Sequence, residues 1–381
     1  MLLPEVVNNP ASNLEEVELD LAPNGPDIKV RWKISGPAFS KPLRISAPLL
    51  KKRSKEVRSA LDSLNQYVKT NHDLDAQRDP GWTNYSQRLQ ILEGYGRGLF
   101  AALFPPDNPE ARQKAEELRN LPKGTRLKVY CSDSEVSLPL GFINDGEISL
   151  PTTGPSLDDF AAFWLSRFEI TMHVDGCGCD NLAVDPEKLK ALYALHEKEL
   201  LGAANWLGED HDKLTRLLTI PAKDHYNWAS VKKAWDTIRD DDNIIFVLAH
   251  SDGDWLLLSE TSQLDCNSLL NLLHKPRSTS TLLILNCCLS AQGGEGASLL
   301  SVIARQGFCG LVGTEAEILN TYALRCGVRL MWDLCAKGLS LGQAFAAMQS
   351  DKSLFPLNLF YTCYADREFR LNQPITDLSM N

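Results

Sequence analysis

Residues 243–251 read NIIFVLAHS, and residues 282–290 read LLILNCCLS. Each stretch contains an almost continuous apolar run that ends in polar residues, and residues 308–312, FCGLV, form a third run. Such runs are typical of strands that are buried on both faces, as in a parallel sheet. Helical patterns alternate with these runs, at residues 267–273, 296–305 and 322–336. The alternation predicts an α/β fold: a doubly wound, mostly parallel sheet with helices on both faces.

Two reactive side chains directly follow the first two runs. His250 ends the first run, and Cys288 follows the second, 38 residues further along the chain. Ligands of open α/β sheets bind beyond the carboxyl ends of the strands, which is where both side chains are expected. A thiolate is a nucleophile, and a neighbouring imidazole can take the thiol proton and later protonate a leaving group. The pattern alone leaves two interpretations open, a catalytic pair or two structural residues.

The chain ahead of these runs predicts a mixture of helices and strands. We expect strands at residues 28–34, 125–131, 137–142 and 168–174. We expect helices at residues 56–68, 85–104, 109–121, 186–202 and 228–238. A last helix and a last strand are expected at residues 341–348 and 357–364.

Composition and these elements together divide the chain into four parts. Residues 1–26 are acidic and rich in Asn and Pro, which is typical of a tail. An α+β region at residues 27–150 is expected to precede the α/β core at residues 151–371. Residues 372–381 are expected to form a second tail.

Charge and hydropathy exclude several classes of partner. With 39 basic and 49 acidic residues, the chain has a formal net charge of −10 at pH 7, which argues against direct nucleic-acid binding. No apolar stretch approaches the ~18 residues that a membrane helix needs, and the acidic N-terminus is unlike a signal peptide. We therefore expect a cytoplasmic protein without a membrane partner, whose ten cysteines are reduced thiols.

The two strand ends resemble the CHAT family of caspase-like cysteine peptidases, relatives of caspases, separase and gingipains. That family has an apolar strand that ends in His, and a second strand that ends in Leu, two further residues and the nucleophilic Cys. Here Leu285 lies three residues before Cys288, so the resemblance makes Cys288 the nucleophile and Cys287 its core neighbour. Further similar pieces extend the resemblance over residues 28–371; they are residues 94–105, 138–139, 293–298, 312–314 and 359–362.

The resemblance implies a caspase-like fold and a cysteine endopeptidase that cleaves a specific protein through a thioacyl-enzyme. His250 would be the general acid and base, and the amides of Ser251 and Cys288 would form the oxyanion hole. The family usually has Gly where this chain has Ser251, which weakens the oxyanion assignment more than that of His250. Neither a metal nor another cofactor is implied. A regulated bacterial defence or cell-death circuit with an activating protein partner would fit the family.

Substrate preference is implied less directly. In related peptidases, acidic residues beside the nucleophile and after the first strand select a basic P1 residue. Asn286, two residues before Cys288, is neutral, whereas Asp175 or Asp180 of the loop DGCGCD would line the S1 pocket. A neutral or apolar P1 residue is the alternative.

Two other features suggest metal sites, and we interpret both as structural. His173, Cys177, Cys179 and Asp180 contain zinc-ligand types, but no second pair with zinc-like spacing accompanies them. His196 begins the sequence HEKEL, which lacks the second His of a helical zinc motif, so we interpret it as a surface residue of a helix.

Two other classes of function remain open at this stage. The fold would also suit an inert scaffold that binds a partner protein, although such proteins commonly lose one catalytic residue, and both His250 and Cys288 are present. A different thiol acyl hydrolase would need the same pair.

Overall fold

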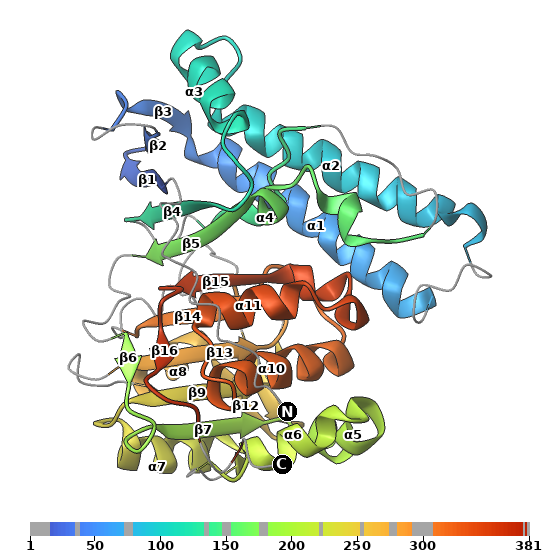
Figure 1. Cartoon of the computed structure of the whole chain (residues 1–381), viewed down its shortest axis with the longest axis vertical. Helices are drawn as coiled ribbons and strands as arrows, with labels where there is room; N and C mark the ends of the chain where they lie inside the picture. The colour runs from blue at the N-terminus through green and yellow to red at the C-terminus, as the bar shows by residue number, and fades with distance from the viewer. Residues whose placement is uncertain are drawn as a thin grey trace, which may run out of the picture.

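The computed structural model of the chain describes residues 16–34, 39–71, 79–132, 137–146, 154–174, 182–220, 224–251, 255–273, 280–291, 308–375 and 378. Two sheets dominate these residues, one of five strands and one of six (Figure 1). The strands of the first come from the N-terminal half of the chain, and those of the second from the C-terminal half. The predicted mixed α/β class is confirmed.

The five-stranded sheet has the order β3-β2-β1-β4-β5. Its strands are β1 (Glu16–Asn24), β2 (Asp27–Lys33), β3 (Leu43–Ser46), β4 (Thr125–Cys131) and β5 (Phe168–Val174). Strands β1, β4 and β5 are parallel to one another, whereas β2 is antiparallel to both of its neighbours. Buried and more exposed residues alternate in β2 and β4, as expected for a sheet with one covered face.

Three helices accompany this sheet: α1 (Ala47–Asn71), α2 (Thr83–Leu103) and α3 (Pro109–Arg119). Helices α1 and α2 lie side by side along much of their length (Figure 1). Aromatic packing joins the sheet to the end of α2, because the rings of Trp32 and Phe104 stack with centroids 4.8 Å apart. All three helices were predicted, with different ends.

The six-stranded sheet has the order β15-β14-β13-β9-β7-β8. Its strands are β7 (Lys190–Leu195), β8 (Asp224–His225), β9 (Asn243–Leu248), β13 (Thr281–Asn286), β14 (Gly310–Thr314) and β15 (Tyr361–Ala365). Strand β15 is antiparallel to β14, and the other neighbours are parallel. Every residue of β9, β13 and β14 is buried, which explains their continuous apolar runs.

Helices cover both faces of this sheet, as predicted. They are α5 (Glu197–Leu207), α6 (Asp210–Leu217), α7 (Trp228–Ile238), α8 (Cys266–Leu272), α10 (Asn320–Cys335) and α11 (Leu341–Gln349). On one face, the Tyr193 hydroxyl donates to the Leu217 carbonyl of α6, and a Cβ atom on Gly327 of α10 would lie 2.6 Å from Phe246. On the other face, the Asn243 amide donates to the Ile238 carbonyl at the end of α7.

Short elements connect these layers. Strands β10 (His250–Ser251), β11 (Trp255–Ser259) and β12 (Ser262–Asp265) form an antiparallel sheet, and β6 (Ala183–Val184) pairs with β16 (Arg370–Leu371). The helix α4 (Trp164–Arg167) and the 3-10 turns η1 (Pro80–Trp82), η2 (Leu140–Phe142), η3 (Leu157–Phe160), η4 (Lys352–Leu354) and η5 (Leu357–Phe360) complete the described elements.

Four of the local predictions are wrong. Residues 190–195, expected within a helix at residues 186–202, form the buried strand β7, because burial between β9 and β8 outweighs the helix propensity of its Leu and Ala residues. Residues 137–142 end in the turn η2 rather than forming a strand. Residues 16–24 of the predicted tail form β1, and residues 372–375 of the second tail hydrogen-bond to the core. The helix expected at residues 296–305 lies outside the described residues.

The state of the cysteines differs from expectation at one position. The free thiols among the described residues are Cys131, Cys287, Cys288, Cys326, Cys335 and Cys363. Cys309 is disulfide-bonded, which corrects the expectation that all ten are reduced. Tertiary proximity decides such a bond, and spacing along the chain does not reveal it. Among the described helices, none is long and apolar enough to cross a membrane.

Candidate active site

The register of two neighbouring strands brings His250 and Cys288 to the same edge of the six-stranded sheet. Strands β9 and β13 are parallel and adjacent, and Leu248 pairs with Asn286 at their carboxyl ends. His250 and Cys288 each follow two residues beyond this last pair. Neighbouring parallel strands therefore bring both residues to the carboxyl edge of the sheet, where α/β folds bind ligands.

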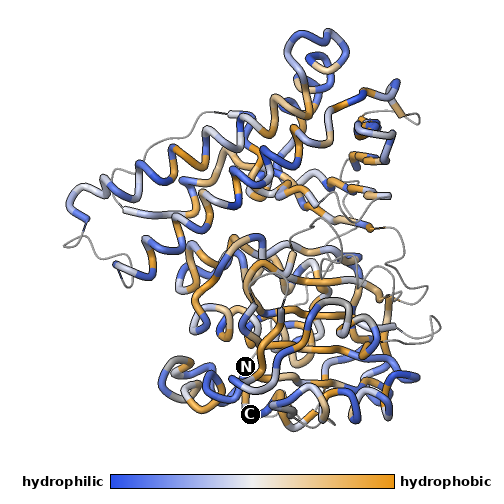
Figure 2. The backbone as a smooth tube through the Cα atoms, turned by 180° about the vertical axis from the view of Figure 1, so that it is seen from behind, coloured by the Kyte–Doolittle hydropathy of each residue, from blue (hydrophilic) through white to orange (hydrophobic). Residues whose placement is uncertain are grey.

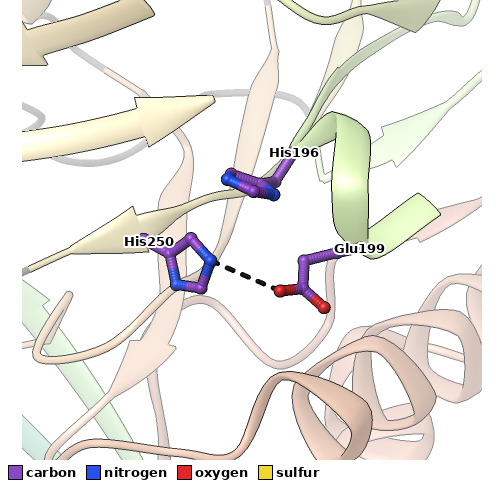
Figure 3. Close-up of side chains that lie close together, drawn as sticks. All are labelled: His196, Glu199 and His250. Carbon is purple, nitrogen blue, oxygen red and sulfur yellow. Dashed lines mark ion pairs between the residues drawn. The ribbon is translucent and has the colours of Figure 1, made fainter. Parts of the chain in front are cut away.

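The His250 imidazole has a carboxylate partner that the sequence analysis did not find. His250 begins β10, and its Nε2 lies 3.3 Å from Oε1 of Glu199 in the first turn of α5. The Asn320 amide at the start of α10 donates to the same Glu199 oxygen at 2.7 Å. Glu199 is thus held between α10 and the imidazole, and it in turn orients the ring (Figure 3).

A second imidazole packs against the first. His196 directly follows β7, and its ring meets that of His250 edge to face, with centroids 4.4 Å apart. Its backbone N–H donates to the Leu248 carbonyl of β9 at 2.8 Å, and the residue is only 6% exposed. Burial and, second, the neighbouring His250 lower the pKa of His196. The interpretation of His196 as a surface helix residue is therefore wrong.

Cys288 occupies a tight turn after β13 and is partly buried. Its Sγ accepts a hydrogen bond from the Ile318 N–H at 3.4 Å and donates to the Ile318 carbonyl at 3.5 Å. The next residue, Leu289, has a left-handed φ of 59°, an uncommon conformation for a branched side chain. Such strain is typical of functional turns, although it is not sufficient to identify one.

The environment of this thiol favours its protonated form. Burial is the largest cause of a raised pKa for Cys288, and the negative charges of Glu317 and Asp62 raise it further. The Ile318 N–H acts in the opposite direction, because it stabilises the thiolate. The thiol therefore needs a base, or a loss of nearby negative charge, before it can react at neutral pH.

Buried hydrogen bonds fix the turn against β14. The Ser290 hydroxyl donates to the Leu285 carbonyl and accepts from the Thr314 N–H, both at 2.9 Å. The Thr314 hydroxyl donates to the Cys287 carbonyl at 2.8 Å. Gly313 allows this approach, because a Cβ atom there would lie 2.8 Å from the Ser290 hydroxyl oxygen. Cys287 itself is buried, at 2% exposure, as expected for the core neighbour of Cys288.

A buried ion pair ties the N-terminal helices to this edge of the sheet. The Arg58 guanidinium of α1 donates to one Glu315 oxygen at 3.0 and 2.8 Å, and Glu315 directly follows β14. Arg58 also donates to the Ser137 hydroxyl, and Thr362 donates to the second Glu315 oxygen. The site is thus supported by residues from both halves of the chain.

The remaining predicted site residues differ in where they lie in the structure. Asn286 is 1% exposed, and its amide is bonded to the Ala323 carbonyl and the Tyr361 hydroxyl, so its side chain lies under α10 rather than at a substrate surface. Ser251 lies in β10, opposite Leu256. Asp175 and Asp180 lie outside the described residues, as do Cys177 and Cys179 of the rejected metal loop.

Two signals for the missed residues are visible in retrospect. The apolar run LYAL at residues 192–195 ends in His196, just as NIIFVLA ends in His250. Glu199 follows three residues later, at the spacing that brings two side chains together on one side of a helical turn. Asn320 and Asp62 carry no such signal, because they reach the site from distant parts of the chain.

Comparisons with known proteins do not assign this chain to a family. No family model and no curated protein matches the sequence. Two crystal structures of the Saccharomyces cerevisiae separase–securin complex are similar to this chain, with TM-scores of 0.48 and 0.49 at 9% and 10% identity. The match covers 93% of this chain and 30% of the matched chain. A likeness of this size does not define a family, so the CHAT resemblance stays a prediction.

Proposed function

We propose that this chain is a cysteine endopeptidase of the caspase-like CHAT type that cleaves a specific protein. The pairing of Leu248 with Asn286 supports the proposal, because His250 and Cys288 each follow two residues beyond this pair on neighbouring parallel strands. An imidazole and a thiol in this relation are the parts that nucleophilic acyl transfer requires.

His250 takes the thiol proton as Cys288 Sγ attacks the scissile carbonyl. The amides of Ser251 and Cys288 stabilise the oxyanion. The imidazolium then gives its proton to the leaving amine, and the carbonyl carbon stays bonded to sulfur as a thioester. Water, deprotonated by His250, releases the acid and restores the thiol.

Glu199 is a positioning residue in this scheme. Because its carboxylate faces His250 Nε2 at 3.3 Å, the neutral ring carries its proton on Nε2 and leaves Nδ1 to accept the thiol proton. The Asn320 amide holds the Glu199 carboxylate in place. The three groups have the roles of a catalytic triad, which consists of a nucleophile, a base, and a third group that orients the base.

The resting thiol is poorly activated, which supports control by a partner. Burial and the carboxylates of Glu317 and Asp62 raise the pKa of Cys288, so little thiolate forms without a change at the site. A protein partner, or a substrate cation near these carboxylates, would lower that pKa. We accordingly propose an activating protein partner, with Asp175 or Asp180 as candidates to line S1.

The cellular setting is proposed from the CHAT resemblance alone. Regulated proteolysis in the bacterial cytoplasm, in a defence or cell-death circuit, fits a protease that stays silent until a partner arrives. An inert scaffold and another thiol acyl hydrolase are the alternatives that the experiment must separate.

The test is a peptide library that spans all P1 residues, with cleavage sites read by mass spectrometry. We expect the wild type to cleave, and Cys288→Ala and His250→Ala to be inactive. Cys287→Ala is the matched control, and we expect it to retain activity. Loss of activity in Cys287→Ala alone would mean that the nucleophile is one residue earlier.

A thiol-reactive acyloxymethyl ketone distinguishes a dormant protease from an inert scaffold. If no peptide is cleaved, labelling of Cys288 that depends on His250 supports a dormant enzyme. Absence of labelling at every pH up to 9 supports the scaffold. Turnover of small thioesters without any peptide cleavage supports a different thiol acyl hydrolase.

A further inference from the structure

Three metal-ligand side chains converge beside the proposed dyad. A nitrogen of His196, a nitrogen of His250 and a carboxylate oxygen of Glu199 all lie within 4.8 Å of one another. His196 directly follows β7, Glu199 lies in the first turn of the next helix, α5, and His250 begins β10 after strand β9 (Figure 3). Two imidazoles and one carboxylate are a ligand set that divalent transition metals favour.

The Nδ1 atom of His196 is a second, independent observation. It is buried and has no hydrogen-bond partner among the residues that the structure describes. The whole residue is 6% exposed, so water satisfies it poorly. An unsatisfied buried nitrogen costs ~1–3 kcal/mol. Core packing alone would be served as well by an apolar side chain, whereas a metal ion bound at Nδ1 would repay this cost.

We propose that His196, Glu199 and His250 bind a divalent transition-metal ion, zinc above all, which reversibly blocks the base of the peptidase. A tetrahedral zinc site with nitrogen and oxygen ligands places neighbouring ligand atoms ~3.3 Å apart. His250 Nε2 and Glu199 Oε1 already have this separation, at 3.3 Å. Since the three ligand atoms lie within 4.8 Å of one another, a shift of the His196 ring by about 1.5 Å at most would complete the set.

The surroundings hold the ligands as a metal site requires. Asn320 donates to the Glu199 oxygen that faces His250, and outer hydrogen bonds of this kind orient ligating carboxylates. The backbone of His196 is fixed at both sides, because its N–H donates to Leu248 and its carbonyl accepts from the Leu200 N–H. The fourth coordination position is left to water or to the substrate side of the site.

The regulatory part of this inference rests on the proposed function. A cation that takes the Nε2 lone pair of His250 fixes the neutral ring as the tautomer whose proton is on Nδ1, so Nδ1 has no lone pair left. The ring then cannot accept the Cys288 proton, and the already poorly activated thiol stays protonated. Release of the ion would restore the base, so the ion acts as an inhibitor rather than as a catalytic cofactor.

The first experiment measures binding without any need for activity. Cobalt(II) and zinc are titrated into purified Cys288→Ala, with cobalt absorbance and calorimetry as readouts. We expect one equivalent to bind, and His196→Gln and Glu199→Gln in this background to weaken binding by at least ~100-fold. His211→Gln, on α6 and outside the cluster, is the matched control and should bind as the parent does. Thermal melts identify any variant that fails to fold, and His250→Gln provides a further ligand replacement.

The outcomes separate the site, its role and the proposed function. Equal affinity in the parent and in folded His196→Gln and Glu199→Gln overturns the site. If wild-type protein cleaves peptide, we expect one equivalent of zinc to remove the cleavage and a chelator to restore it. Binding at this cluster that leaves cleavage intact overturns the inhibitory role. If no peptide is cleaved, the ketone labelling of Cys288 decides the proposed function, while the metal-binding result still decides the site.

Discussion

Each of the two sheets contains a pair of neighbouring parallel strands, and the two pairs differ in what surrounds them: β5 is an edge strand, whereas β9 and β13 are both interior strands. In the five-stranded sheet, β4 and β5 end with the pair Cys131 and Val174. In the six-stranded sheet, β9 and β13 end with the pair Leu248 and Asn286. Strand β4 alternates between buried and more exposed residues, whereas every residue of β9 and β13 is buried. Figure 2 shows the difference as long hydrophobic stretches in the lower sheet.

The difference explains where polar chemistry concentrates. The open face of the first sheet carries charged side chains along its strands, such as the pairs Arg126–Glu169 and Lys128–Glu16. Exposed pairs of this kind contribute little to stability. Helices cover both faces of the second sheet, so its strands admit polar groups mainly beyond their ends. His250 and Cys288 lie at that place, which makes them candidates for function.

The largest effect is expected on peptide cleavage, where substitution of Cys288 should differ from substitution of Cys131. We expect Cys288→Ala to lower kcat/KM for a cleaved peptide by more than ~10³-fold, because it removes the nucleophile. Cys131→Ala, in β4, should leave activity per folded molecule unchanged. Equal losses in both variants would show that the effect is structural and would remove the functional distinction between the sheets.

The ion pair between the two halves should have the next largest effect, on stability. Arg58→Met removes the cation that faces the Glu315 carboxylate, which is 0% exposed. We expect a loss of ~3–5 kcal/mol in the free energy of unfolding by urea, since removing one member of a buried pair is costly. The double variant Arg58→Met with Glu315→Gln should recover part of this loss. Arg126→Met in the exposed pair is the control, and a loss as large there would refute the burial argument.

Gly→Ala substitutions in helices of the two regions should change the free energy of unfolding in opposite directions. A Cβ atom at Gly327 of α10 would lie 2.6 Å from Phe246 and 2.7 Å from the Asn286 amide nitrogen, so Gly327→Ala should destabilise by ~1–3 kcal/mol. Gly94 of α2 has no atom of the described residues within 4 Å of such a Cβ, so Gly94→Ala should stabilise by up to ~1 kcal/mol. Urea unfolding of both variants measures the difference. Stabilisation by Gly327→Ala would contradict the close packing of α10 on the sheet.

The smallest effect is a shift in the pH dependence of one thiol. The negative charge of Glu317 raises the pKa of Cys288, so Glu317→Gln should lower that pKa and move the alkylation midpoint toward lower pH. Iodoacetamide labelling of Cys288, followed by peptide mass spectrometry across pH, measures it. Glu169→Gln, in the five-stranded sheet, is the matched control and should leave the midpoint unchanged. A rise of the alkylation midpoint in Glu317→Gln would contradict the proposed effect of the Glu317 charge on the pKa of Cys288.

The elements that were predicted well are those whose apolar pattern fits one kind of element only. The runs of β9 and β13 are apolar throughout because helices cover both faces of their sheet, and so local sequence suffices to identify them. Helix α7, at residues 228–238, was likewise predicted with its observed bounds from its apolar spacing. Strand β7 was missed because KALYAL also has the spacing and residue types of a helix, and only its two neighbouring strands decide the outcome.

The sequence by itself determined the strand types, their apolar runs, and the presence of His250 and Cys288 just past two of those runs. These features depend on residues that are adjacent in the chain, and their physical basis is local burial. Only the tertiary structure decided that β9 and β13 are neighbours in this register and that His196 is buried against His250. It also decided that Asn320, Glu317 and Asp62 reach the same edge. Such contacts join residues far apart in the chain, so they arise from the packing of whole elements and leave no local pattern.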